Sequence, residues 1–128
     1  MSAGPQVSLS EIGQIAILVK DIARATGFYR DKLGMKYLFS AGNLAFFDCG
    51  GVRLMLSLPE QEQSGNSVIY FKVPELAGLR QQMQSRGVHF IDEPHLIARM
   101  PDHELWMTFF RDSEGNLLGL MSEVRAKA

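Results

Sequence analysis

The sequence predicts an α+β protein built from two copies of one βαβββ unit, whose strands form a curled mixed sheet around a central cavity. Three observations support this fold class: an internal repeat, apolar residues at helical spacing in both copies, and glycine-marked turns between short strands. The stretches 15–22 (IAILVKDI) and 68–76 (VIYFKVPEL) each read as an apolar strand followed by an acidic turn. In each copy a helical segment then runs to a glycine, Gly34 or Gly87.

Each predicted helix has its own start and stop signals. Asp21 is placed to cap the first helix by accepting from the free N–H groups of its opening turn. Pro74 fits the first position of the second helix, where its missing N–H costs nothing. Gly34 and Gly87 suit the left-handed residue that closes a helix. The apolar stripes between these signals comprise Ile22, Ala25, Phe28, Tyr29 and Leu33 in the first copy, and Leu76, Leu79 and Met83 in the second.

Three short strands follow each predicted helix. Gly50-Gly51 marks a tight hairpin turn in the first copy, and the stretch 112–115 (DSEG) marks its counterpart in the second. We expect a single domain over 11–124, with modules at 11–58 and 67–124, a polar linker at 59–66, and a loop at 97–103 that has no counterpart in the first copy. The expected strands are 35–40, 44–49 and 52–58, then 88–91 (with an extension to 96 left open), 104–111 and 116–123.

Composition and charge exclude several classes of function. The chain has 128 residues, a formal net charge of −1 and 46% hydrophobic residues, which is a globular composition with no basic field for nucleic acid or an anionic membrane. Cys49 is the only cysteine, so no internal disulfide forms and a reducing compartment is favoured. The first residues do not resemble a signal peptide, and no apolar run is long enough to cross a membrane. We expect a cytoplasmic protein.

Three local motifs resemble those of a known family. The stretches 19–22 (VKDI), 28–34 (FYRDKLG) and 110–116 (FRDSEGN) resemble motifs of the vicinal oxygen chelate superfamily, which includes glyoxalases, bleomycin-resistance proteins and extradiol dioxygenases. Ser113 stands where the family usually has proline. The resemblance spans about 11–124 and implies the βαβββ–linker–βαβββ order. Because members of this family are commonly dimers, it also implies a homodimer.

The resemblance identifies four positions at which enzymes of this family hold a divalent metal. Here they are Gln14, Met55, Val68 and Gly119. Only Gln14 has a suitable donor, because a thioether is a poor ligand for hard cations and the other two side chains have no donor atom. We therefore expect no metal at this site, and no other cofactor, since no glycine-rich phosphate loop leads into a helix.

A hairpin register predicts which side chains line the cavity. If Thr108 lies opposite Gly119, then Trp106, Thr108 and Phe110 share a face with Met121, while Phe46 lies opposite Met55 in the first copy. Gly119 lies inside the predicted strand 116–123. A glycine at such a position suggests close approach of another group, such as Trp106, a backbone segment or a planar ligand. The alternative is that these side chains simply fill the interior. The predicted ligand-binding residues are Gln14, Phe46, Met55, Trp106, Thr108, Phe110 and Met121.

Two histidines flank the loop at 97–103 and are candidates for a lid that contacts the ligand. His95 and His103 could also be plain solvated residues, or could form a relocated metal site together with Glu104. Adjacent strand residues such as His103 and Glu104 point to opposite faces, which weakens the three-ligand site. No nucleophile lies in an arrangement with a base, and no catalytic residue is assigned.

Three functions remain open from the sequence. The first is a metal-free protein that binds a planar or apolar small molecule in an aromatic pocket, as the antibiotic-sequestering branch of the family does. The alternative is an enzyme of the same superfamily, a lyase, isomerase or dioxygenase-like protein with a displaced metal site or a metal-independent mechanism. The third is a small regulatory or partner-binding module.

Overall fold

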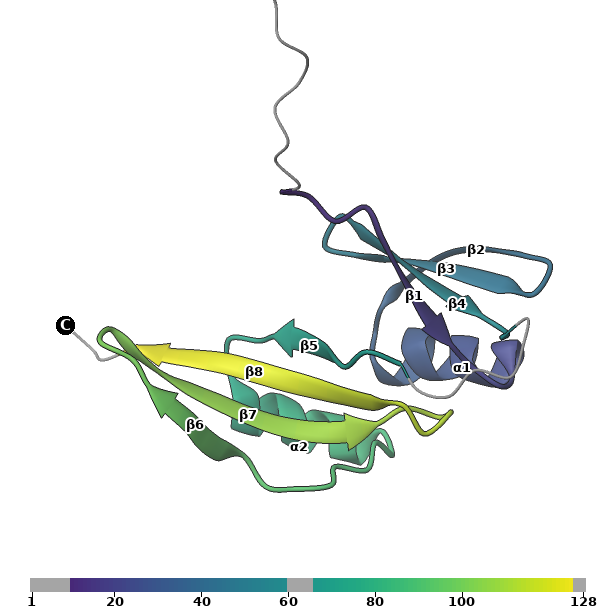
Figure 1. Cartoon of the computed structure of the whole chain (residues 1–128). Coiled ribbons are helices and arrows are strands. Elements are labelled where there is room, and N and C mark those ends of the chain that lie inside the picture. Colours follow the sequence, from purple (N-terminus) through teal and green to yellow (C-terminus); the bar gives the residue numbers. More distant parts are fainter. Residues whose placement is uncertain (1–9, 60–65, 126–128) are drawn as a thin grey trace, which may run out of the picture.

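A computed structural model describes residues 10–59 and 66–125, so the predicted linker at 59–66 lies mostly outside the described residues. The described chain contains the predicted repeat, with each module running strand, helix, strand, strand, strand. Figure 1 shows the two modules side by side, each with a sheet and a helix of its own. The predicted α+β class and the repeat are confirmed.

The first module forms a four-stranded mixed sheet in the order β1-β4-β3-β2, in which β1 and β4 are parallel (Figure 1). The other two pairs are antiparallel, as short hairpins require. Its elements are β1 (Gln14–Leu18), α1 (Ile22–Gly27), η1 (Phe28–Lys32), β2 (Lys36–Ala41), β3 (Leu44–Cys49) and β4 (Val52–Ser57).

The second module repeats this topology, with the order β5-β8-β7-β6 and a parallel pair formed by β5 and β8. Among the described residues, no strand pairing joins the two sheets. Its elements are β5 (Ile69–Lys72), α2 (Leu76–Ser85), β6 (His95–Arg99), β7 (His103–Arg111) and β8 (Leu117–Arg125).

The helix ends follow the sequence signals in most respects. Asp21 caps α1, its carboxylate accepting from Arg24 N–H at 3.0 Å, and Gly34 adopts the predicted left-handed conformation with φ +68°. The last turn of the first helix is a π-helix, which was not predicted, because Leu33 N–H donates to the Phe28 carbonyl five residues back. One expectation was wrong. The cap of α2 is Glu75, which accepts from Gly78 N–H at 2.6 Å, so Pro74 lies before the cap rather than in the helix.

The sixth strand lies further along the chain than predicted. The 88–91 segment contributes only a bridge between Phe90 and Phe110. The strand β6 covers His95–Arg99, so it begins within the extension to 96 that was left open and ends within the predicted loop at 97–103. The reason is Asp92, whose carboxylate accepts from the Phe109 backbone N–H at 2.9 Å. The Asp92 side chain thus accepts from the Phe109 N–H group, which would otherwise donate to the backbone of a continuous strand. Regular pairing with β7 resumes only at His95.

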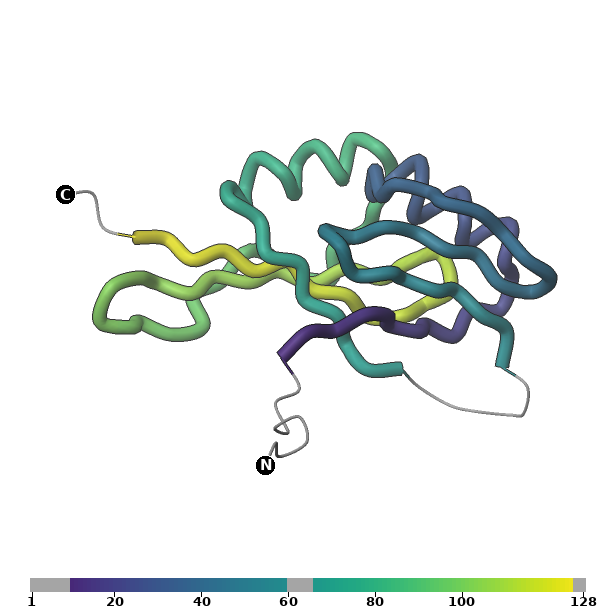
Figure 2. The backbone as a smooth tube through the Cα atoms, turned by 90° about the horizontal axis from the view of Figure 1, so that it is seen from above, coloured from purple at the N-terminus to yellow at the C-terminus, as the bar shows by residue number. Residues whose placement is uncertain are grey.

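The core lies between the helices and the inner faces of both sheets. Fully buried residues come from both modules, among them Tyr29, Phe47 and Leu56 from the first and Phe110 and Leu118 from the second. Figure 2 shows both helices on the same side of the molecule. One continuous core therefore joins the modules although their sheets are separate. No helix in the described residues combines the length and apolarity needed to span a membrane.

Buried polar contacts fix the β7–β8 turn of the second module against the first helix. The Tyr29 hydroxyl donates to Asp112 Oδ2 at 2.8 Å, and both side chains are buried. Burial, together with the nearby Asp112 carboxylate, raises the pKa of the Tyr29 hydroxyl far above its usual range. Tyr29 therefore stays a neutral donor.

Glu114 carries the second set of contacts and has a side chain that is 1% exposed. Its carboxylate accepts from the backbone N–H groups of Lys20 and Asp21 at 2.9 and 2.8 Å, and from the Arg24 guanidinium at 2.7 and 3.0 Å. These bonds, led by that from Arg24, lower the pKa of Glu114 to about 2. An anion from one module thus satisfies the strand-to-helix turn of the other.

Candidate ligand site on the open faces of the sheets

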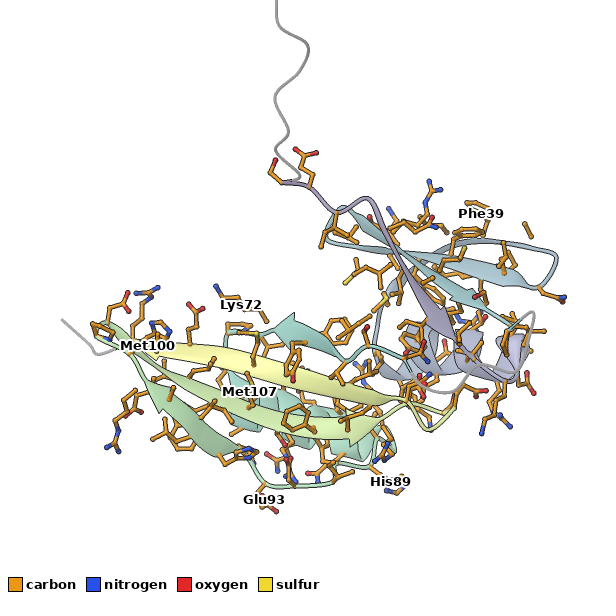
Figure 3. The ribbon with its side chains drawn as sticks, in the orientation of Figure 1. Phe39, Lys72, His89, Glu93, Met100 and Met107 are labelled. Atoms are coloured by element: carbon orange, nitrogen blue, oxygen red, sulfur yellow. The ribbon has the colours of Figure 1, made fainter. Side chains whose placement is uncertain are left out.

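Each sheet has one face packed against the core and one face that the helices leave open. On the open face of the first sheet, Phe46 lies opposite Met55, as the sequence predicted. Phe39 stacks on Phe46 with ring centroids 4.6 Å apart, and the Arg53 guanidinium lies 5.6 Å from the Phe46 ring. Figure 3 shows Phe39 projecting from β2 on the side away from α1. This face is an aromatic platform with one cation over it.

Gln14 and Met55, two of the four metal positions that the family resemblance implies, lie next to each other. Gln14 Nε2 donates to Met55 Sδ at 3.7 Å. The amide thus meets a soft sulfur rather than a carboxylate or imidazole. A hard divalent cation would find one neutral oxygen and one weak thioether from this module.

The open face of the second sheet differs from the prediction by one residue. Thr108 lies opposite Leu120, not opposite Gly119, and the partner of Gly119 is Phe109. A shift of one residue inverts every side chain of a strand. The residues that β7 contributes to the open face are therefore Met107 and Phe109, and Figure 3 shows Met107 near the middle of that strand.

Gly119 lies beneath two aromatic rings. Tyr70, its partner on β5, packs edge to face against Phe109 with ring centroids 5.8 Å apart. A Cβ atom at Gly119 would lie 2.9 Å from Tyr70 Cδ2 and 3.1 Å from Phe109 Cε1. The glycine suspected of a close approach thus makes one, to Tyr70 and Phe109 rather than to Trp106.

Trp106, Thr108 and Phe110 lie on the other face of β7, so the prediction that they line the open face together with Met121 was wrong. Thr108 and Phe110 are fully buried. Thr108 donates to the Asp92 carboxylate at 2.7 Å, and the Trp106 indole donates to Glu104 at 3.2 Å. Met121 lies opposite Met107 and remains on the open face.

The two candidate lid histidines lie apart. His95 lies on β6 and pairs with Met107 of β7. The centroid of its ring is 6.3 Å from that of the Phe109 ring, so His95 borders the open face. His103 lies at the far end of β7, where Nδ1 meets Asp102 Oδ1 at 2.7 Å. Glu104 points to the opposite face and contacts Arg99 and Trp106. The structure does not bring His95, His103 and Glu104 together.

The residues at the four family positions do not fit a divalent metal ion. Gln14 supplies the only oxygen donor, Val68 ends in carbon atoms, and aromatic rings cover Gly119. Within 10–59 and 66–125, no cluster of three or more His, Cys, Asp or Glu side chains is placed to hold a metal. We therefore derive no chemical step through a metal at this site.

Sequence reasoning missed three aromatic residues of this site. Phe39 was predicted in a strand without an assigned face, and Tyr70 and Phe109 were not considered. A signal for Tyr70 was present, because it lies two residues after Val68 and so shares the face of a family metal position. Phe109 required the correct β7–β8 register, which the turn sequence does not specify.

Two βαβββ modules, each with one parallel strand pair and one open sheet face, define the class of fold. A sequence model of the Glyoxalase/Bleomycin resistance protein/Dioxygenase superfamily matches residues 11–120. The chain belongs to this superfamily, as the motifs at 28–34 and 110–116 indicated.

Known proteins similar to this chain agree with that assignment. The Bacillus subtilis (strain 168) protein YetH is 25% identical over 121 residues, which cover 85% of this chain and 95% of YetH. A lactoylglutathione lyase from Agrobacterium tumefaciens superposes with a TM-score of 0.72 at 22% identity, covering 88% of this chain and 93% of that one. An integron cassette protein from V. cholerae superposes with a TM-score of 0.75 at 20% identity, covering 91% and 98%. At this identity the structures establish the fold alone.

Proposed function

We propose that this protein binds a planar, apolar small molecule on the open faces of its sheets without a metal ion. The observation that carries the proposal is the pair of rings over Gly119. Where the family resemblance places a metal ligand, Tyr70 and Phe109 form an aromatic corner instead. Tyr70 is 46% exposed, so one side of this corner is accessible to a ligand.

The first sheet offers a matching surface, which supports assembly of the site from two chains. Phe39 is 45% exposed although it stacks on Phe46. Each sheet also ends in outer strands that pair on one side only, β1 and β2 in one sheet and β5 and β6 in the other. A homodimer that lays the first sheet of one protomer over the second sheet of its partner would enclose a ligand between two aromatic platforms.

The test combines ligand binding with metal content. The full chain, purified without chelator or metal-affinity resin, is titrated by calorimetry with a panel of planar aromatic compounds of differing size. We expect at least one to bind, and Phe109→Ala to weaken that binding about tenfold or more because a stacking ring is lost. Phe90→Ala, which removes a ring from the core side of the second module, is the control for general damage.

Two results would contradict the proposal. Absence of binding across the panel would remove the ligand function. About one tightly held ion per chain, with stabilisation by added nickel, cobalt, zinc, manganese or iron(II), would instead favour an enzyme such as the lyase named for the Agrobacterium protein. His95 and His103 would then be the first residues to replace.

A further inference from the structure

A cavity lies between the modules, on the core side of the sheets. It has a volume of about 450 Å³, within the range of about 300–1,000 Å³ typical of small-molecule sites. Its walls come from the turn after η1, the β3–β4 hairpin, α2 and the inner face of the second sheet. None of its lining residues belongs to the aromatic platforms described above.

The floor of this cavity is apolar. Phe110 and Leu120, both buried, contribute from β7 and β8, and Met83 and Leu79 contribute from α2. Phe71 lines it from β5. Water cannot form hydrogen bonds with these apolar side chains. Covering them with a hydrocarbon chain is therefore favourable, by about 25 cal/mol per Å² of apolar surface removed from water.

The rim of the cavity is positively charged. Lys32 and Arg86 cross at the boundary between the modules: a Cβ placed at Gly34 would lie 3.7 Å from Arg86 Nη1, and one placed at Gly87 would lie 3.3 Å from Lys32 Nζ. Lys36 is the third cation of the lining. Within the described part of the chain, none of the three forms an ion pair.

One acid moderates this positive charge. Asp48 lines the cavity and accepts from the Gly51 N–H at 3.2 Å. Lys36 lies opposite Asp48 in the β2–β3 pairing, so these two charges offset each other and leave Lys32 and Arg86 as the cations available to one carboxylate. The planar guanidinium of Arg86 offers the paired donors that match a carboxylate.

We propose that this cavity binds an amphiphilic monocarboxylate, with its apolar chain on the Phe110–Met83 floor and its carboxylate between Lys32 and Arg86. The proposal goes beyond the function assigned to the open faces and does not depend on it. Since the walls come from both modules, an occupant would also bridge them.

Cys49 provides a built-in measure of occupancy. It is the only cysteine of the chain, it lines the cavity and it is partly buried. Burial raises the pKa of its thiol above the usual range, so the thiol reacts slowly and in proportion to its access to solvent. A ligand seated in the cavity should slow that reaction further.

The experiment titrates the full chain with decanoate by calorimetry and follows the reaction of Cys49 with a disulfide reagent in the same samples. We expect one decanoate per chain and a several-fold slower thiol reaction at saturation. Lys32→Gln and Arg86→Gln should each weaken decanoate binding about tenfold, or about 1.4 kcal/mol. Arg30 lies in the same helical turn as Lys32, but its side chain pairs with Asp31 outside the cavity. The control Arg30→Gln therefore removes the same charge and should leave decanoate binding unchanged.

Neutral decanamide separates the contribution of the charge from that of the chain, and should bind about tenfold more weakly than decanoate. Three results would overturn the proposal. The first is no binding of decanoate at millimolar concentration, and the second is equal binding of decanamide and decanoate. The third is decanoate binding that does not slow the reaction of Cys49 and that is equally tight in Lys32→Gln and the wild type. Phe109→Ala should affect only the planar ligand of the open faces, so that failure of one site is distinguishable from failure of the other.

Discussion

Glu114 is the residue whose replacement tests the joining of the modules most directly. The change Glu114→Gln keeps the shape of the side chain but removes its charge and one acceptor oxygen. Because the carboxylate accepts from Lys20, Asp21, Arg24 and Ser113, the amide nitrogen of glutamine would face a donor in any orientation. With the amide nitrogen in the place of Oε1, the Lys20 and Asp21 N–H groups lose their acceptor; in the place of Oε2, the Arg24 Nε–H and the Ser113 hydroxyl lose theirs.

The magnitude follows from the pKa of Glu114. A folded value of about 2 against an ordinary 4.5, at about 1.36 kcal/mol per pH unit, corresponds to roughly 3 kcal/mol of stability at pH 7. Arg24 is about half exposed, so water screens its charge and we expect about 2 kcal/mol. The folded pKa is lowered, so this stability is present above pH 4.5 and is lost as the pH falls toward 2.

The assay is urea unfolding at pH 7 and pH 3, followed by far-ultraviolet circular dichroism. Glu114→Gln should be less stable than the wild type at pH 7, and the difference should shrink to less than half at pH 3. Glu93→Gln, at a side chain that is 85% exposed, is the matched control and should change stability by less than about 0.5 kcal/mol. Equal stability of Glu114→Gln and wild type at pH 7, or a difference that does not change with pH, would refute the reasoning.

Three further changes have expected outcomes that the same unfolding assay checks. Tyr29→Phe leaves a buried Asp112 oxygen with one donor fewer and should cost about 1–3 kcal/mol; a cost below about 0.5 kcal/mol would contradict the buried bond. Gly119→Ala pushes a methyl group against Tyr70 and Phe109 and should cost about 1–3 kcal/mol; a cost below about 0.5 kcal/mol would contradict the close approach of the two rings. Asp21→Ala removes the cap of α1 and should cost about 1 kcal/mol, whereas Asp21→Asn should cost less.

The sequence was sufficient for features that depend on local chemistry. The repeat, the Asp21 cap and the left-handed Gly34 were all predicted, because capping and positive φ act within a few residues. The register of the first hairpin was also correct, since Gly50 and Gly51 close a two-residue turn that leaves Phe46 opposite Met55. Residue types alone also showed which of the four family metal positions carry a side chain that can coordinate a metal ion.

Tertiary structure decided the features that depend on distant contacts. The second hairpin has the same kind of sequence signal, but its turn retains one more residue: Asp112 N–H donates to the Asn116 carbonyl, so Arg111 pairs with Leu117 instead of Asn116. Asp112 is held there by Tyr29, a residue of the other module. In this register Phe109 faces the open side and Phe110 faces the core, because side chains alternate along a strand and a shift of one residue exchanges the two faces.

The sequence by itself therefore determined the modules, their family and the chemistry missing from the metal positions. Only the folded chain decided which aromatic rings line the open faces, because that choice rests on the β7–β8 register and on the packing of Phe110 into a core built from both modules. It also decided that Lys32 and Arg86 lie at one rim, since each lies at the end of a helix of a different module and only packing brings those helix ends together.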